Sequence, residues 1–108
     1  SRFADYPVAS LRQKVLSLFT KISMLMNRIG NSNSRLEEFP QYELIVLSQL
    51  LGHVSHLLEE LEYDPARAAD EQEDILTSLD GMIDTYDSIE VPILQALKKT
   101  KNAIKVIG

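Results

Sequence analysis

The chain has 108 residues, of which 44% are apolar, and it carries 16 acidic and 11 basic side chains for a net charge of −5. This is enough apolar material for one modest folded domain, which excludes a disordered chain and leaves no room for two domains. The absence of cysteine excludes disulfides, thiolate catalysis and cysteine-ligated metals, and the acidic balance disfavours nucleic acid as a partner.

No apolar run approaches the roughly 18–20 residues that a membrane-spanning helix needs, and no signal peptide is recognisable at the beginning of the sequence. These observations predict a soluble protein with an intracellular, cytoplasmic location and no transmembrane segment. Because the first residue is Ser1, we expect residues 1–108 to form a single domain excised from a longer protein.

Four prolines, at positions 7, 40, 65 and 92, each precede a run of residues with helical periodicity. The first run predicts a helix over Val8–Ile29, ended by Gly30 in a left-handed conformation. Its apolar stripe is wide, which makes a homodimer through this helix one prediction. In the linker that follows, Ser34 and Glu37 have the spacing of a capping box and predict a short turn.

The second predicted helix covers Gln41–Glu62 and has the most continuous apolar face of the chain. Its leucines and valine alternate at spacings of three and four, which is typical of a helix that packs on a core. The stripe consists of Leu44, Leu47, Leu51, Val54, Leu58 and Leu61.

The third predicted helix runs from Pro65 to Ile89, with Asp64 as its N-cap. A fourth helix then begins at Pro92. We expect a tight turn over Glu90–Pro92, because the residue before a proline disfavours helical angles. The predicted fold is an all-α, antiparallel four-helix bundle; the alternative is that the third and fourth helices form one kinked helix.

Charge changes sign abruptly near the last proline. Between Glu59 and Glu90 there are twelve acids and one base, Arg67, whereas the residues from Val91 onward hold four lysines and no acid. In an antiparallel arrangement the acidic and basic segments would lie alongside each other. The fourth helix would place Lys98, Lys101 and Lys105 beside an apolar stripe of Ile93, Leu97, Ile104 and Ile107.

A cluster with potential chemistry lies on the second helix, where His53, His56 and Glu60 are spaced to fall on one side. This arrangement could hold a metal ion or handle phosphate, but the favoured interpretation is that these are ordinary exposed residues of an amphipathic helix. The sequence contains no glycine-rich phosphate loop and no nucleophile motif. We therefore predict no enzyme activity, no cofactor and no metal.

The remaining candidates are surfaces for a protein partner. On the third helix, an acidic stripe of Glu73, Asp80, Asp84 and Asp87 faces away from the apolar residues and would attract a basic helix or peptide. On the polar face of the second helix, Ile45 and Gln49 lie close to Gly52, where a partner side chain could be received. These features predict an adaptor or scaffold module that binds a helix or peptide through a helix face or groove.

One stretch also resembles a known family. Its residues Asp74, Ile75 and Leu76, with Asp80, Ile83 and Tyr86, are similar to the third helix of the GAT bundles of endosomal clathrin adaptors. This resemblance implies a trafficking adaptor that binds ubiquitin and sorting partners. A comparison with the BAG-type chaperone-binding bundle is less favourable, because its basic third-helix positions are matched here by acids.

Overall fold

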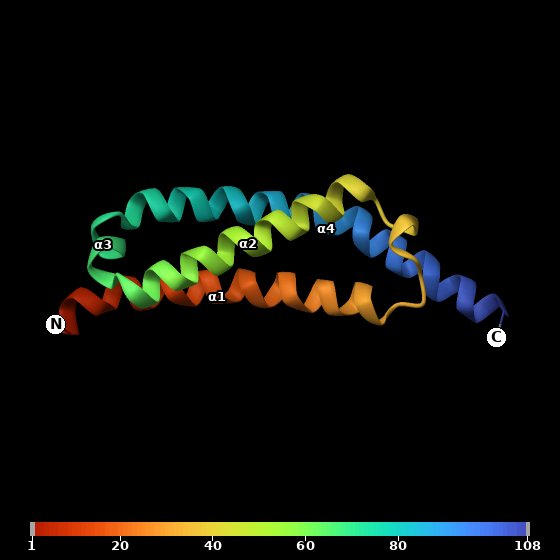
Figure 1. Cartoon of the computed structure of the whole chain (residues 1–108), viewed down its shortest axis with the longest axis horizontal. Helices are drawn as coiled ribbons and strands as arrows, with labels where there is room; N and C mark the ends of the chain where they lie inside the picture. The colour runs from red at the N-terminus through yellow and green to blue at the C-terminus, as the bar shows by residue number, and fades with distance from the viewer. Residues whose placement is uncertain (1, 108) are drawn as a thin grey trace.

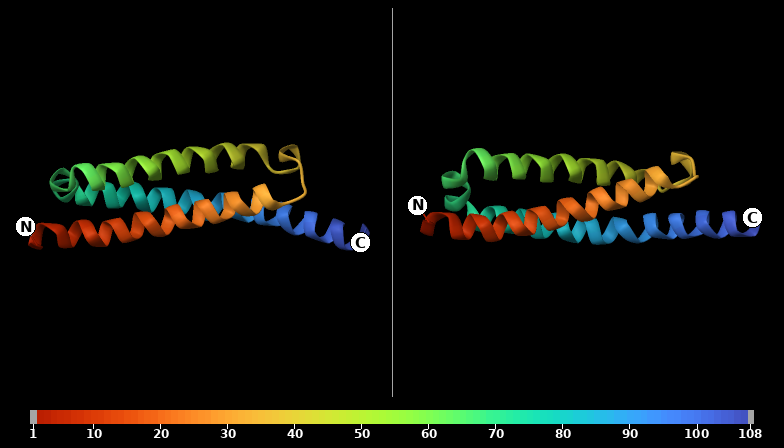
Figure 2. Two further views of the ribbon diagram at one scale, coloured as in Figure 1. Left: turned by 60° about the horizontal axis from the view of Figure 1, so that its bottom comes forward. Right: turned by 90° about the horizontal axis from the view of Figure 1, so that it is seen from below.

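The computed structural model describes the backbone of residues 2–107 and the side chains of residues 8–100. The chain folds into α1 (Arg2–Asn31), the 3-10 turn η1 (Leu36–Glu38), α2 (Gln41–Tyr63), α3 (Pro65–Asp70) and α4 (Gln72–Ile107), and the described residues contain no strand. The predicted all-α class is therefore confirmed. The three long helices pack lengthwise into a rod of 60 × 21 × 17 Å (Figures 1 and 2).

One continuous core runs along the rod, because each long helix contributes an apolar stripe with spacings of three and four residues. α2 runs antiparallel to α1 and α4, and each of the three helices contacts the other two (Figure 1). The largest fully buried side chains are Leu11, Val15, Ile22, Leu47, Val54, Leu61, Leu79 and Ile93.

The predicted turn over Glu90–Pro92 is wrong, because α4 continues through Pro92 as one helix. The alternative of a single helix is the observed one, and the packing explains why. Ile75 and Ile93 are eighteen positions apart, which is five complete helical turns, so both face the core and Ile93 is 0% exposed. A turn at this point would withdraw the later apolar residues from the core that they help to form.

The same continuity corrects the expected placement of charge. The acids and the lysines do not lie on two antiparallel helices; they follow one another along α4, with Glu73 and Asp74 in its first turn. Negative charge near the N-terminus and positive charge near the C-terminus of a helix both interact favourably with its dipole. The predicted ion pairs between two neighbouring segments are therefore replaced by charge separation along one helix.

The chain reverses direction through α3, which lies across one end of the bundle (Figure 1). Asp64 accepts a hydrogen bond from the backbone N–H of Arg67 at 3.3 Å, so the predicted N-cap is confirmed. The predicted helix over Pro65–Ile89 is nevertheless interrupted at Glu71, whose φ of −99° and ψ of 16° depart from helical values. The short helix α3 and the break at Glu71 together connect the end of α2 to the beginning of α4.

The first helix is longer than predicted at both ends. Gly30 does not adopt a left-handed conformation, and no glycine among the described residues has a positive φ. α1 instead ends where the hydroxyl of Ser32 donates a hydrogen bond to the carbonyl of Ile29 at 2.7 Å. The predicted short turn appears as η1, although its N-cap is Arg35, with no side-chain cap, and Ser34 hydrogen-bonds to Thr100.

None of the helices within the described residues is long and apolar enough to cross a membrane. The C-terminal end of α4 runs past the connection between α1 and α2, so one end of the rod is formed by a single helix (Figures 1 and 2).

Candidate functional site

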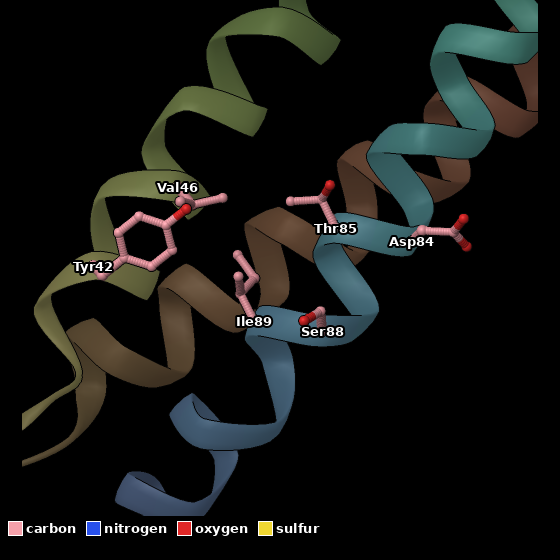
Figure 3. A pocket seen from close by; sticks show the side chains of 6 residues that line it. All are labelled: Tyr42, Val46, Asp84, Thr85, Ser88 and Ile89. Atoms are coloured by element: carbon pink, nitrogen blue, oxygen red, sulfur yellow. The ribbon is translucent and has the colours of Figure 1, made fainter.

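A groove of about 300 Å³ lies between the first turns of α2 and the middle of α4 (Figure 3). It is open to the surface and combines apolar with hydroxyl and carboxylate side chains. α2 contributes Tyr42 and Val46, and α4 contributes Asp84, Thr85, Ser88 and Ile89.

The entry of the chain into α2 positions Tyr42. Phe39 is buried in the core just before the helix begins, and the side-chain amide of Gln41 donates hydrogen bonds to the carbonyls of Leu36 and Phe39 at 2.7 and 2.9 Å. These contacts hold the first turn of α2 in place. Tyr42 nevertheless remains 71% exposed, so a large aromatic ring stands at the edge of the groove and is available to a partner.

The α4 side of the groove has three polar residues, Asp84, Thr85 and Ser88, and one apolar residue, Ile89. Ile89 is buried and provides an apolar base, while Thr85 points its methyl group toward Val46 (Figure 3). The Thr85 hydroxyl donates to the carbonyl of Gly81 at 2.9 Å. Because Pro92 has no N–H, the carbonyl of Ser88 loses its partner four residues along the helix.

The structure brings only one of the six predicted partner-binding residues into this groove. Asp84 lines it, with a carboxylate that points away from α2 at the rim (Figure 3). The other five, Glu73, Asp80, Asp87, Ile45 and Gln49, do not line it, although all six are exposed. Sequence reasoning missed Tyr42 and Val46, which lie beside the leucine stripe of α2. An aromatic residue just outside an apolar stripe is the signal that could have identified this edge.

The acidic stripe is unpaired within the described part of the chain. Among the side chains of residues 8–100, the ion pair is Arg67 with Glu71, at 3.3 Å, and His56 lies 3.0 Å from Glu60. Neither includes an acid of the stripe Glu73, Asp80, Asp84 and Asp87. Its negative potential is consequently directed to solvent and to any approaching cation.

The histidine cluster of α2 is exposed and does not converge on a common point. Nε2 of His56 lies 3.0 Å from Oε1 of Glu60, and His53 takes no part in that pair. In the described part of the chain, no group of three or more histidine and acidic residues could hold a metal ion. Phosphate handling by these histidines stays a prediction.

Two further predicted surfaces are placed by the structure. Most of the apolar stripe of α1 is buried, and among the described side chains of this helix Leu16 and Met24 are the large apolar ones that remain exposed. In the stretch that resembles the adaptor bundles, Ile75 and Tyr86 are buried in the core, so these two side chains are unavailable to a ligand. Of the lysines of α4, Lys98 is exposed, whereas Lys101 and Lys105 lie outside the described side chains, as do Ile104 and Ile107.

Comparison of this chain with protein-family models, curated proteins and solved structures found no match in any of the three.

Proposed function

We propose that this chain is a non-catalytic protein-interaction module that binds a basic helix or peptide of a partner protein in the groove between α2 and α4. The observation that carries the proposal is the groove itself, with the exposed ring of Tyr42 on one wall and Asp84 at the outer rim of the other, its carboxylate pointing away from α2. An aromatic anchor beside a charged rim is a common arrangement at protein interfaces.

Charge complementarity supports a basic occupant. The chain has a net charge of −5, and Asp84, which forms no ion pair among the described side chains, stands at the rim of the groove. Such a field increases the association rate of a cationic partner and sets orientation more than affinity. The apolar contacts with Tyr42, Val46 and Ile89 would supply most of the binding free energy. An adaptor or scaffold role and an intracellular location belong to this proposal.

A titration with a defined probe tests this function. A synthetic amphipathic helix of leucine and lysine would be added to the isotopically labelled chain, and backbone amide shifts would be followed by NMR. We expect the largest changes at Tyr42, Val46 and Thr85, and a weaker response to a matched peptide of leucine and glutamate. Changes confined to another surface, or equal binding of both peptides, would contradict the proposal.

Two variants make the test specific. Tyr42→Ala should weaken the binding of the lysine-containing peptide by about ten-fold, since interface aromatic residues commonly contribute about 1–2 kcal/mol or more to the binding free energy. Tyr63→Ala is the matched control, because Tyr63 lies at the other end of α2 and is 85% exposed. Both substitutions remove an exposed ring, so neither should disturb the fold.

A further inference from the structure

The outward side of α4 carries a second pattern, which shares only Asp84 with the groove. Asp80, Asp84 and Asp87 are followed, at alternating spacings of four and three, by Val91 and Leu94. This is the spacing at which one side of a helix packs along another helix. The three aspartates are exposed, Val91 is 54% exposed, and Leu94 is half-buried at the edge of the core.

The pattern continues without interruption into the basic end of the helix. After Leu94 come Lys98, Lys101 and Lys105, again at spacings of four, three and four. Lys98 is exposed, and the other two follow by sequence register on the same helix, which extends to Ile107. One seam therefore holds three aspartates, two aliphatic residues and three lysines, in that order.

This seam is complementary to itself when it is reversed. The positions 80 and 105, 84 and 101, and 87 and 98 are symmetric about a point between residues 92 and 93. Two antiparallel copies of α4 would thus place each aspartate opposite a lysine, with Val91 opposite Leu94 at the centre. A parallel pair would place aspartate opposite aspartate, which is repulsive.

We propose that the occupant of this face is a second copy of the chain, bound through antiparallel α4 helices in a two-fold symmetric dimer. A two-fold interface requires a self-complementary patch, in which each pairwise contact between the two copies occurs twice. The projecting end of α4 fits the arrangement, because it would lie along the acidic half of the other copy's α4 (Figures 1 and 2). The seam meets the groove only at Asp84, because Thr85, Ser88 and Ile89 line the groove whereas Asp87 and Lys98 do not.

The composition of the seam also sets the strength of the dimer. Exposed ion pairs contribute little individually, and only two aliphatic positions lie at the centre, so self-association is weak and depends on protein concentration. Since the pairs are exposed, added salt screens them. We expect the sedimentation coefficient to rise with concentration at low ionic strength and to rise less at high ionic strength.

The test uses two charge-reversal variants of the full chain, Lys98→Glu and Asp87→Lys. Each should self-associate about ten-fold more weakly than the natural chain, because each places like charges opposite one another at two symmetric points. An equimolar mixture of the two variants should associate, since their heterodimer restores opposite charges at both points. Circular dichroism checks that both variants remain helical.

Lys99→Glu is the matched control. It makes the same charge change one residue along, at an exposed position off the seam, and should leave self-association unchanged. The proposal is overturned if the natural chain remains a monomer at every concentration, if Lys98→Glu and Lys99→Glu have equal effects, or if the mixed variants fail to associate.

Discussion

The hydroxyl of Tyr86 lies 2.7 Å from Oε2 of Glu90, one turn further along α4, and 3.3 Å from the backbone carbonyl of Lys21 on α1. Tyr86 is buried, so its hydroxyl needs an acceptor, and these two contacts provide acceptors on both helices. The aromatic ring packs in the core while the hydroxyl joins α4 to α1. Tyr86 thereby helps to set how the two helices lie against each other.

Replacing this tyrosine with phenylalanine tests that role. Tyr86→Phe keeps the ring but removes the donor, leaving the carboxylate of Glu90 without its partner. We expect a loss of about 1.5 kcal/mol in the free energy of unfolding, the lower end of the range for a hydrogen bond to a charged group, because Glu90 is only half-buried. Urea unfolding followed by circular dichroism measures it. An unchanged midpoint would mean that water replaces the hydroxyl at no cost.

The same residue predicts a pH dependence at alkaline pH. Burial, and then the hydrogen bond to Glu90 and its negative charge, raise the pKa of Tyr86 above its ordinary value. In the unfolded chain the phenol ionises near pH 10, whereas in the folded chain it stays protonated at higher pH. The protonated phenol of Tyr86 therefore contributes its full share of the free energy of unfolding below about pH 10, and this share decreases as the pH rises further. Unfolding midpoints measured at increasing pH should fall less steeply for Tyr86→Phe than for the natural chain.

Pro92 lies inside α4, and its replacement should stabilise the protein. Pro92→Ala restores an N–H that can donate to the carbonyl of Ser88, and it removes the clash of the ring with that carbonyl. A proline inside a helix costs about 3 kcal/mol, so we expect a gain of about 1–3 kcal/mol, visible as a higher thermal midpoint. Destabilisation would instead be expected if the chain turned at this proline.

Ile93 and Val91 provide a matched pair on the two sides of that proline. Ile93 is 0% exposed, so Ile93→Ala removes core contacts and leaves a cavity, at a cost of about 2–5 kcal/mol. Val91 is 54% exposed, and Val91→Ala should change the stability by less than about 0.5 kcal/mol. Chemical denaturation of both variants is the measurement. Similar effects at the two positions would contradict a helix that continues through Pro92 in one register.

Two glycines inside helices are positions where alanine should be favourable. A Cβ atom added at Gly52 of α2 or Gly81 of α4 would meet nothing within 4 Å, and neither residue has a positive φ. Each substitution by alanine should add about 0.5–1 kcal/mol, because glycine loses more backbone entropy on folding. Differential scanning calorimetry should show higher midpoints for both, and a lower midpoint for either would indicate that the added methyl group disturbs its surroundings.

The candidate groove shows which residues of a site can be predicted from the side-chain pattern of one helix and which cannot. Asp84 was identified from the acidic stripe, since charge at helical spacing can be read along a single element. Tyr42 and Val46 became part of the groove only because α2 lies next to the middle of α4. Which edges of two helices meet depends on their relative rotation and offset, and neither quantity is encoded in the periodicity of one helix.

The sequence by itself determined that the chain is all-helical, where α2 lies, and that Asp64 begins a helix, because apolar periodicity and capping are local properties. The spacing from Ile75 to Ile93 also contained the information that α4 is continuous, although the proline suggested a turn. Only the tertiary structure decided between the two. Burial of Ile93 and Leu97 in the core compensates for the hydrogen bond lost at Pro92, and that compensation depends on neighbours distant in the sequence.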